Sequence, residues 1–304
     1  MVTWDKAYLS RVYAALIVPF NADESVNFEA ISQLVEQQLR DGVEGFYCCG
    51  SSGEALLLSV EERKAIVEHV VKQVNGRVPV IAHIGTVRTA DVVSLAKHAR
   101  ECGCAAISMI PPYYYKFSMD EIAGYYEDVI AAVPDMPVIL YNIPQFTGVE
   151  FSKSNAKRLL DNPNIVGIKH TSQNLYSMER MISAYPEKLM INGFDEQLLG
   201  ALSMGATATV STTANLFAPL FVGIRKAYNA GEMSDALVLQ KDLNRRVEEL
   251  VSVGIFPGTK YGCTIRGIDC GRCRRPFAWL NEDQKAIVRD TVLRPYPEIL
   301  QKYL

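Results

Sequence analysis

The chain has 304 residues, of which 49% are hydrophobic and 21% charged, and its net charge is −3. This composition provides for a large core, argues against disorder, and gives no electrostatic reason to expect nucleic acid or an anionic membrane as a partner. No apolar run approaches the roughly 18 residues of a membrane span, and the N-terminus lacks the pattern of a signal peptide. A soluble, cytoplasmic protein is therefore expected.

Short apolar segments alternate with helical patterns along most of the chain. Their continuous apolar character is typical of strands buried on both faces. They predict eight strands over Ala14–Pro19, Gly45–Cys49, Val78–His83, Ala105–Ile110, Pro137–Asn142, Ile165–His170, Leu189–Asn192 and Ala208–Ser211. Two of the helices between them should begin at capping boxes, Ser59–Glu62 and Ser118–Glu121.

The order of these elements predicts the fold class. Eight strand–helix units in roughly 225 residues match an α/β fold of the (β/α)8 TIM-barrel type better than an open doubly wound sheet. After about residue 230 the strands stop, and a long amphipathic helix over Leu237–Val253 is followed by further helical patterns. We predict a catalytic barrel over residues 1–230 and a helical C-terminal extension over residues 231–304 that packs on the barrel.

The C-terminal ends of barrel strands carry the chemistry in this fold class. The sixth strand ends with Lys169, and the fifth ends with Tyr141 and Asn142. A lysine without hydration has a lowered pKa, and its neutral amine is a nucleophile toward ketones. A phenol at the same mouth could transfer a proton. The alternatives are a lysine that reaches the surface or pairs with a carboxylate, and a tyrosine that only packs.

Other strand ends carry groups that suit a carboxylate or a polyol. The turn Gly50–Gly53 offers backbone N–H groups and the hydroxyls of Ser51 and Ser52, although such a turn can also be an ordinary loop. The seventh strand ends in Gly193-Phe194-Asp195-Glu196, and the eighth in Ser211-Thr212-Thr213.

A metal site is the less favoured interpretation. The seven cysteines are an odd number, which argues against a disulfide framework, and a zinc site joining Cys102 and Cys104 to Cys270 and Cys273 competes with buried free thiols. His83 and His170 also end strands, but the chain has only four histidines and no ligand motif. We expect neither a metal nor a cofactor.

Four motifs, read together, resemble one known family. They are GSSGEA at 50–55, YNIP at 141–144, GIKHTS at 167–172 and NGFDE at 192–196. In order and spacing they are similar to the pyruvate-dependent class I aldolases, the family of N-acetylneuraminate lyase and dihydrodipicolinate synthase, over nearly the whole chain. The resemblance implies a TIM barrel with a helical C-terminal extension, usually assembled as a homotetramer.

The resemblance also implies roles for individual residues. Lys169 would form the Schiff base with pyruvate, Tyr141 would shuttle the proton, and Tyr114 would be lent across a subunit interface to a neighbouring site. Ser51 and Ser52 would hold the pyruvate carboxylate. The other implied substrate-binding residues are Thr171, Gly193, Asp195, Glu196, Phe256 and, if the serine of the lyases' eighth loop has a counterpart here, Thr212.

Within the family, the sequence is closer to the sialic acid lyases. Phe146 stands where the synthases carry an arginine, and the run KHTSQNLYSMERM is similar to that of the lyases. The implied reaction is the reversible cleavage of N-acetylneuraminate to pyruvate and N-acetylmannosamine. Ser52, His170 and the segment Ser211–Asn215 depart from the lyase pattern, so an aldolase for another 2-keto-3-deoxy sugar acid, or a dihydrodipicolinate synthase, is the alternative.

Two interpretations from other functional classes remain. The barrel could be a sensor that binds a keto acid without turnover. Lys169 could instead bind pyridoxal phosphate, although no glycine-rich phosphate loop is evident.

Overall fold

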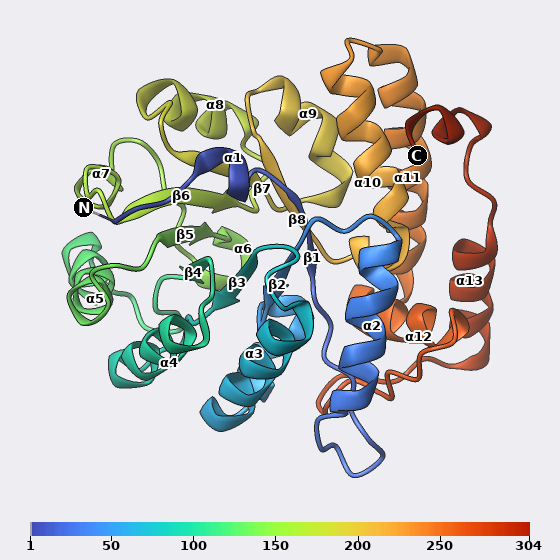
Figure 1. The fold of residues 1–304 in the computed structure, drawn as a ribbon, viewed down its shortest axis with the longest axis horizontal. Helices are drawn as coiled ribbons and strands as arrows, with labels where there is room; N and C mark the ends of the chain where they lie inside the picture. Colours follow the sequence, from blue (N-terminus) through green and yellow to red (C-terminus); the bar gives the residue numbers. More distant parts are fainter. Residues whose placement is uncertain (1) are drawn as a thin grey trace.

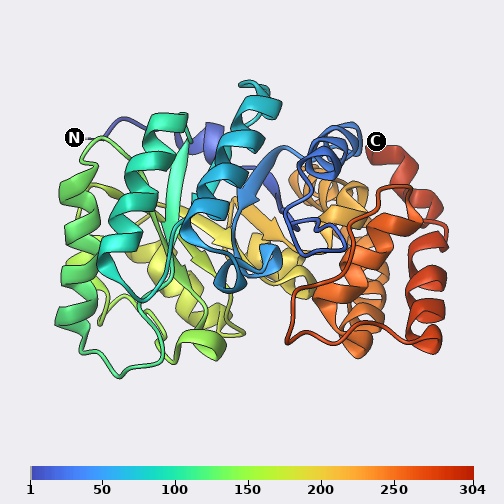
Figure 2. The same ribbon diagram turned by 90° about the horizontal axis from the view of Figure 1, so that it is seen from below.

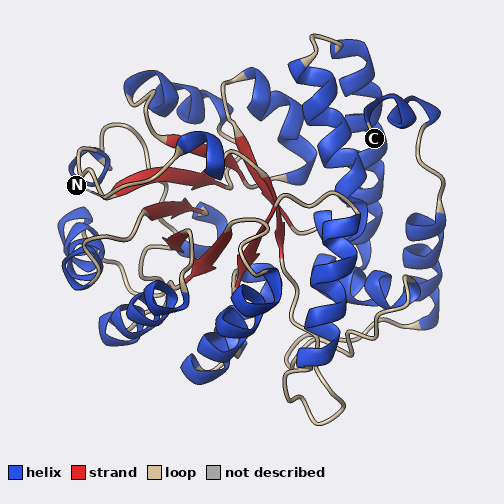
Figure 3. Ribbon diagram, in the orientation of Figure 1, coloured by secondary structure: helices blue, strands red, loops and turns tan. Residues whose placement is uncertain are grey.

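Eight parallel strands form the centre of the molecule. The computed structural model describes residues 2–304, and in it the strands close into a barrel in the order β1 to β8 (Figures 1 and 3). The strands are β1 (Val12–Ala15), β2 (Gly45–Cys48), β3 (Val80–His83), β4 (Ala106–Met109), β5 (Val138–Asn142), β6 (Ile165–His170), β7 (Leu189–Asn192) and β8 (Ala208–Ser211). The predicted TIM-barrel fold is confirmed.

Helices surround the barrel on its outer face (Figure 3). They are α2 (Phe28–Arg40), α3 (Val60–Val74), α4 (Thr89–Cys102), α5 (Met119–Ala132), α7 (Lys157–Leu160), α8 (Leu175–Ala184), α9 (Leu198–Ser203) and α10 (Ala214–Asn229). Both predicted capping boxes are present, at Ser59 before α3 and at Ser118 before α5. No helix within residues 2–304 is long and apolar enough to cross a membrane.

The first strand differs from its prediction. β1 covers Val12–Ala15, whereas the apolar run suggested Ala14–Pro19. Residues 16–18 are as buried as the strand itself, and the Ile17 N–H donates to the Asn215 side chain of α10 at 3.4 Å. A continuous run of apolar residues indicates burial, but it does not show which residues form hydrogen bonds with neighbouring strands. The run therefore continued past the residues that pair with neighbouring strands.

The barrel interior changes from apolar to polar along its axis. At the N-terminal end the short helix α1 (Lys6–Leu9) contributes Leu9 to the inner cluster, and the Tyr13 hydroxyl donates to the Leu9 carbonyl at 3.0 Å. Ile81 and Ile139 fill the middle. At the other end, the inner residues of β2 to β6 carry hydroxyl, imidazole and amine groups, and these define the candidate active site.

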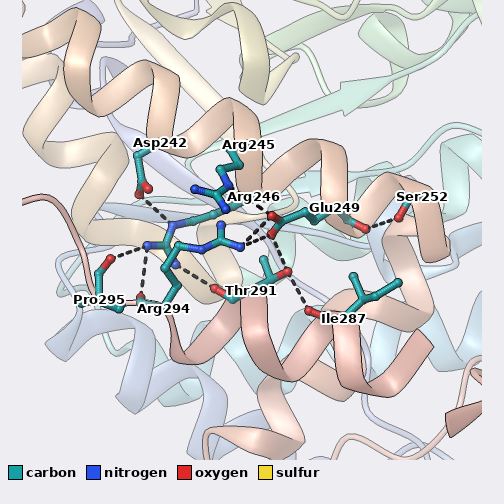
Figure 4. A network of polar contacts seen from close by, with 9 residues as sticks. All are labelled: Asp242, Arg245, Arg246, Glu249, Ser252, Ile287, Thr291, Arg294 and Pro295. Carbon is teal, nitrogen blue, oxygen red and sulfur yellow. Dashed lines mark hydrogen bonds and ion pairs between the residues drawn. The ribbon is translucent and has the colours of Figure 1, made fainter. Parts of the chain in front are cut away.

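A helical C-terminal part lies on one side of the barrel (Figure 2). It contains α11 (Met233–Val253), α12 (Ile255–Ile265), α13 (Glu282–Leu293) and the 3-10 segment η4 (Glu298–Tyr303). The fully buried Arg246 joins α11 to α13 by an ion pair with Asp242 at 2.8 Å and by donation to the carbonyls of Thr291 at 2.8 Å and Pro295 at 2.9 Å (Figure 4). The helical extension is confirmed, and its separation as a domain at residue 230 stays a prediction.

Candidate active site

Lys169 lies on β6 with its amine inside the barrel. The register pairs it with Tyr141 on β5, and its Nζ lies 3.8 Å from the centre of the Tyr141 ring. The side chain is only 4% exposed. Burial lowers the pKa of Lys169 against the opposing effects of Tyr141 and Asp195, because an ammonium group loses hydration there. The larger neutral fraction makes this amine a better nucleophile than a surface lysine.

A second tyrosine faces the same amine. Tyr47 on β2 lies with its ring centre 4.1 Å from the Lys169 Nζ, and its ring meets that of Tyr141 edge-on at 6.1 Å. Its hydroxyl donates to Ser108 on β4 at 3.0 Å. Tyr47 is not among the site residues predicted from the sequence. A phenol one residue before a strand end was the available signal, but the strand is buried throughout and shows no alternation to say which way each side chain points.

The two strand-end histidines are engaged differently. The Nδ1 of His83 donates to the Cys49 carbonyl at 2.9 Å, while its buried Nε2 has no partner in residues 2–304. Burial, with Arg63 and Lys169 nearby, holds the pKa of His83 well below its usual value, so its ring is neutral. Both ring nitrogens of His170 have neighbours, the Asn142 amide at 3.1 Å and the Asn174 carbonyl at 3.2 Å.

The predicted anion-binding turn follows β2. Residues Ser51–Gly53 form a 3-10 turn, η1, which is followed by a second one, η2 (Ala55–Leu57). The Ser52 hydroxyl hydrogen-bonds that of Thr212 at 2.7 Å, so the turn and the loop after β8 are adjacent. This places Thr212, whose counterpart in the family was uncertain, beside the turn.

Gly193 and Thr171 lie against each other at the ends of β7 and β6. The Gly193 N–H donates to the His170 carbonyl at 2.9 Å. A Cβ on Gly193 would lie 1.9 Å from the Thr171 Oγ1, so no other residue fits there without displacing the threonine. That Oγ1 is buried and has no hydrogen-bond partner in residues 2–304. A buried hydroxyl of this kind is available to a ligand.

The two acidic residues after β7, Asp195 and Glu196, differ in burial. Asp195 is 7% exposed, and its Oδ2 accepts from the Thr213 N–H at 2.9 Å and from the Thr213 hydroxyl at 2.6 Å. Burial raises the pKa of Asp195 to about 6. Glu196 is half-buried. The hydrogen bonds orient the Asp195 carboxylate, and Asp195 also acts electrostatically on Lys169.

A cavity of about 390 Å³ opens beside the turn and the end of β3. Its lining includes Ser51, His83, Tyr113, Phe146, Phe256 and Phe277. The rings of Phe256, on α12, and Phe277 meet edge-on at 5.7 Å, so the C-terminal extension supplies part of the wall. Phe256 therefore lies at the candidate site although it comes from outside the barrel.

Tyr114 lies away from this cluster within a single chain. Its side chain is 88% exposed, and its backbone has a positive φ of 77°, which is uncommon for a residue with a side chain. The ring meets the exposed Tyr115 ring edge-on at 5.1 Å. The single chain therefore does not bring Tyr114 to Lys169.

The cysteines are free thiols. Six are buried and Cys102 is half-buried, and none forms a disulfide. Within residues 2–304 no group of three or more His, Cys, Asp or Glu side chains is arranged to hold a metal ion.

Comparisons with known proteins show the family to which the chain belongs. The sequence model of the dihydrodipicolinate synthetase family matches residues 8–294. An N-acetylneuraminate lyase of Rhizobium meliloti (strain 1021) is 41% identical over 93% of this chain and 94% of its own, and one of Lactiplantibacillus plantarum is 33% identical over 90% and 94%. The structure of a wild-type sialic acid aldolase from Ruminococcus gnavus, 29% identical, superposes with a TM-score of 0.92 over 99% of this chain and 100% of its own. This chain belongs to the dihydrodipicolinate synthetase family.

Proposed function

We propose that this protein is a carbon–carbon lyase that cleaves N-acetylneuraminate to pyruvate and N-acetylmannosamine, reversibly, through a Schiff base on Lys169. The observation that carries the proposal is the buried amine of Lys169, paired in register with Tyr141 and enclosed by aromatic rings. The N-acetylneuraminate lyases among its similar relatives support the choice of substrate.

The first half of the reaction uses the amine. The neutral Nζ of Lys169 attacks the C2 ketone of the open-chain sugar acid, a C–N bond forms, and water leaves to give an iminium ion. Tyr141 gives its phenol proton to the oxygen that leaves as water, and the resulting phenolate takes the proton of the C4 hydroxyl as the bond between C3 and C4 breaks. The electron pair of that bond moves to the iminium nitrogen and forms an enamine. The aldehyde half leaves as N-acetylmannosamine.

The second half restores the enzyme. The enamine carbon C3 takes the proton back from Tyr141. Water then adds to the iminium ion and returns a proton to the Tyr141 phenolate, and the C–N bond breaks to release pyruvate and the Lys169 amine. Ser51 and Ser52 hold the pyruvate carboxylate at the turn after β2 in this proposal, where the serine hydroxyls and the backbone N–H groups at the start of the turn suit an anion.

The sugar portion meets a mixed polar and aromatic surface. Asp195 and Glu196 accept hydrogen bonds from its hydroxyls, with Thr171, Gly193 and Thr212 beside them. The support is the orientation of Asp195 by Thr213 and the unpartnered Oγ1 of Thr171. Carboxylates are strong acceptors for hydroxyl groups. Phe256 forms part of the cavity wall.

Phe146 supports a sugar acid over an aldehyde that bears its own carboxylate. Its ring lines the cavity and offers no charge. A phenyl ring cannot replace the bidentate guanidinium that the synthases carry at this position. The same wall would accept other 2-keto-3-deoxy sugar acids, which are the second candidate substrates because Ser52 and the strand-eight loop depart from the lyase pattern.

Tyr114 supports a homotetrameric assembly. Its exposed ring and positive φ suit a side chain that completes the site of a neighbouring subunit. Light scattering should report the mass of four chains, and a monomer with full activity would contradict this part of the proposal.

Borohydride trapping tests the mechanism directly. Protein is incubated with pyruvate, reduced with borohydride and digested, and mass spectrometry of the peptides should find the reduced adduct on Lys169. Lys169→Arg should abolish trapping, while Lys188→Arg, a change at a partly buried lysine near the opposite end of β6, should not. Active protein without an adduct on Lys169 would overturn the mechanism.

Pyruvate release distinguishes the substrates. The protein should release pyruvate from N-acetylneuraminate faster than from other 2-keto-3-deoxy sugar acids, and it should not condense pyruvate with aspartate semialdehyde. Efficient condensation with the semialdehyde would overturn the argument from Phe146. Binding of pyruvate without any turnover would instead favour a sensor.

A further inference from the structure

A buried ion pair joins the anion-binding turn to the C-terminal extension. Glu54 follows directly after η1, and its Oε1 lies 2.6 Å from the Nζ of Lys260 on α12. The side chains of Glu54 and Lys260 are 0% and 1% exposed, so the pair is buried. The mechanism proposed above uses neither residue.

Both charged groups have further partners that come from the extension or from the loop after β1. The other carboxylate oxygen of Glu54 accepts from the Arg274 N–H at 2.8 Å. The Lys260 amine donates to the Arg272 carbonyl at 3.1 Å and lies 3.9 Å from the centre of the Phe20 ring. Each Glu54 carboxylate oxygen therefore has a neighbour from the extension, the Lys260 ammonium group at Oε1 and the Arg274 N–H at Oε2.

The backbone of Glu54 explains why the turn needs such an anchor. Glu54 has φ 55° and ψ 35°, a left-handed conformation that a residue with a side chain adopts at a cost. It ends η1 and begins η2, so its conformation sets the direction of the chain on both sides. Ser52 and Ser51 lie two and three residues before it. An unanchored Glu54 would relax, and the two serines would move with it.

We propose that Lys260 is a positioning residue that acts through Glu54 to hold the Ser51–Ser52 turn in the conformation that binds the substrate carboxylate. The extension then contributes to binding through this ion pair as well as through the cavity wall. The inference rests on the proposed function, because it assumes that pyruvate binds at this turn.

Removing one partner should disturb the turn more than it disturbs the rest of the fold. A buried charge that loses its counter-charge is strongly unfavourable, so the chain should rearrange until water or another group reaches it. Within the extension, Arg246 holds α11 to α13 independently of Lys260, so the rearrangement should be concentrated at the turn. Lys260→Met keeps most of the length of the side chain and removes the charge.

The test measures pyruvate binding separately from the fraction of folded protein. Trapping by borohydride is followed as a function of pyruvate concentration, and the half-saturating concentration is compared among variants. Lys260→Met should raise it by roughly tenfold or more, while the trapping rate at saturating pyruvate stays near that of the unmodified protein, because Lys169 is intact. A purely structural role would lower the amount of active protein and leave the half-saturating concentration unchanged.

Arg246→Met is the matched control. Arg246 is also a fully buried cation of the extension with a carboxylate partner, Asp242, but its hydrogen bonds to other elements go to α13 and the residues after it, and none goes to the turn (Figure 4). Its loss should lower the melting temperature without changing the half-saturating concentration. An equal rise in this control would show that general destabilisation is responsible, and it would overturn the proposal.

A second variant covers the case in which Lys260→Met does not fold. Glu54→Gln keeps the shape of the side chain and an acceptor for the Arg274 N–H. It should also raise the half-saturating concentration of pyruvate. A value within about twofold of the unmodified protein in either folded variant would overturn the inference. If the unmodified protein itself is not trapped by pyruvate, the proposed function fails instead.

Discussion

The burial of Asp195 predicts a cost in stability that depends on pH. Its folded pKa is raised to about 6 from an ordinary value of 3.8, because burial outweighs the hydrogen bonds from Thr213. Since the folded state binds this proton more tightly than the unfolded state, the carboxyl contributes stability below about pH 3.8 and loses that contribution as the pH rises through about 6. The difference between the two pKa values corresponds to about 3 kcal/mol.

Asp195→Asn isolates this contribution. The amide keeps an oxygen for the Thr213 N–H and is neutral at every pH, so the variant should gain stability relative to the unmodified protein as the pH rises. Urea unfolding followed by circular dichroism, at one protein concentration from pH 4 to pH 8, should show the difference in the free energy of unfolding change by about 2–3 kcal/mol, most of it below pH 7.

The same variant links stability to activity. Asp195→Asn should be more stable near neutral pH yet cleave N-acetylneuraminate poorly, since an ionised acceptor for the sugar hydroxyls is lost. Thr213→Val removes one donor to the carboxylate and should shift the pH window upward. A stability difference that does not vary with pH, or that grows in favour of the unmodified protein as the pH rises, would refute the reasoning.

Three further predictions concern the mechanism, the packing of the site and the cysteines. Tyr141→Phe should lower kcat by about 10²–10⁴-fold while borohydride trapping with pyruvate persists, and unchanged kcat would remove the tyrosine from proton transfer. Gly193→Ala should lower both the melting temperature and kcat/KM, because its Cβ would meet the Thr171 hydroxyl. Gly124→Ala on α5 is the control and should be neutral or stabilising, because a Cβ there meets nothing within 4 Å. Equal effects of the two substitutions would contradict the packing argument. A thiol reagent should label Cys102 first in native protein, as found by peptide mass spectrometry, and faster labelling of any other cysteine would contradict the burial of the remaining six.

Much of the fold could be predicted because burial leaves a direct mark on the sequence. Strands of a parallel barrel are covered on both faces, so their residues are continuously apolar, and the predicted bounds of β6, β7 and β8 agree with the structure. Capping boxes are equally local, because their hydrogen bonds join residues three apart. The predicted bounds of the first strand were wrong because the buried residues that follow the strand are also continuously apolar.

The candidate site could be predicted only in part. Its members lie at strand ends, which the fold class alone selects, and the motifs of the family name most of them. Tyr47 was missed because a strand buried throughout does not reveal which residues point inward. Tyr114 was predicted to be an active-site residue, but in the single chain its side chain is exposed to solvent. Its proposed role therefore depends on a neighbouring subunit.

The sequence by itself determined the number and order of the strand–helix units, the helical extension and the position of Lys169 at a strand end, because each depends on residues close together in the chain. Only the tertiary structure decided which groups meet. It set Tyr141 opposite Lys169, Thr212 against Ser52 and Lys260 against Glu54, the last pair 206 positions apart in the chain. Such contacts follow from closing the barrel and folding the extension back on it, and no local pattern encodes them.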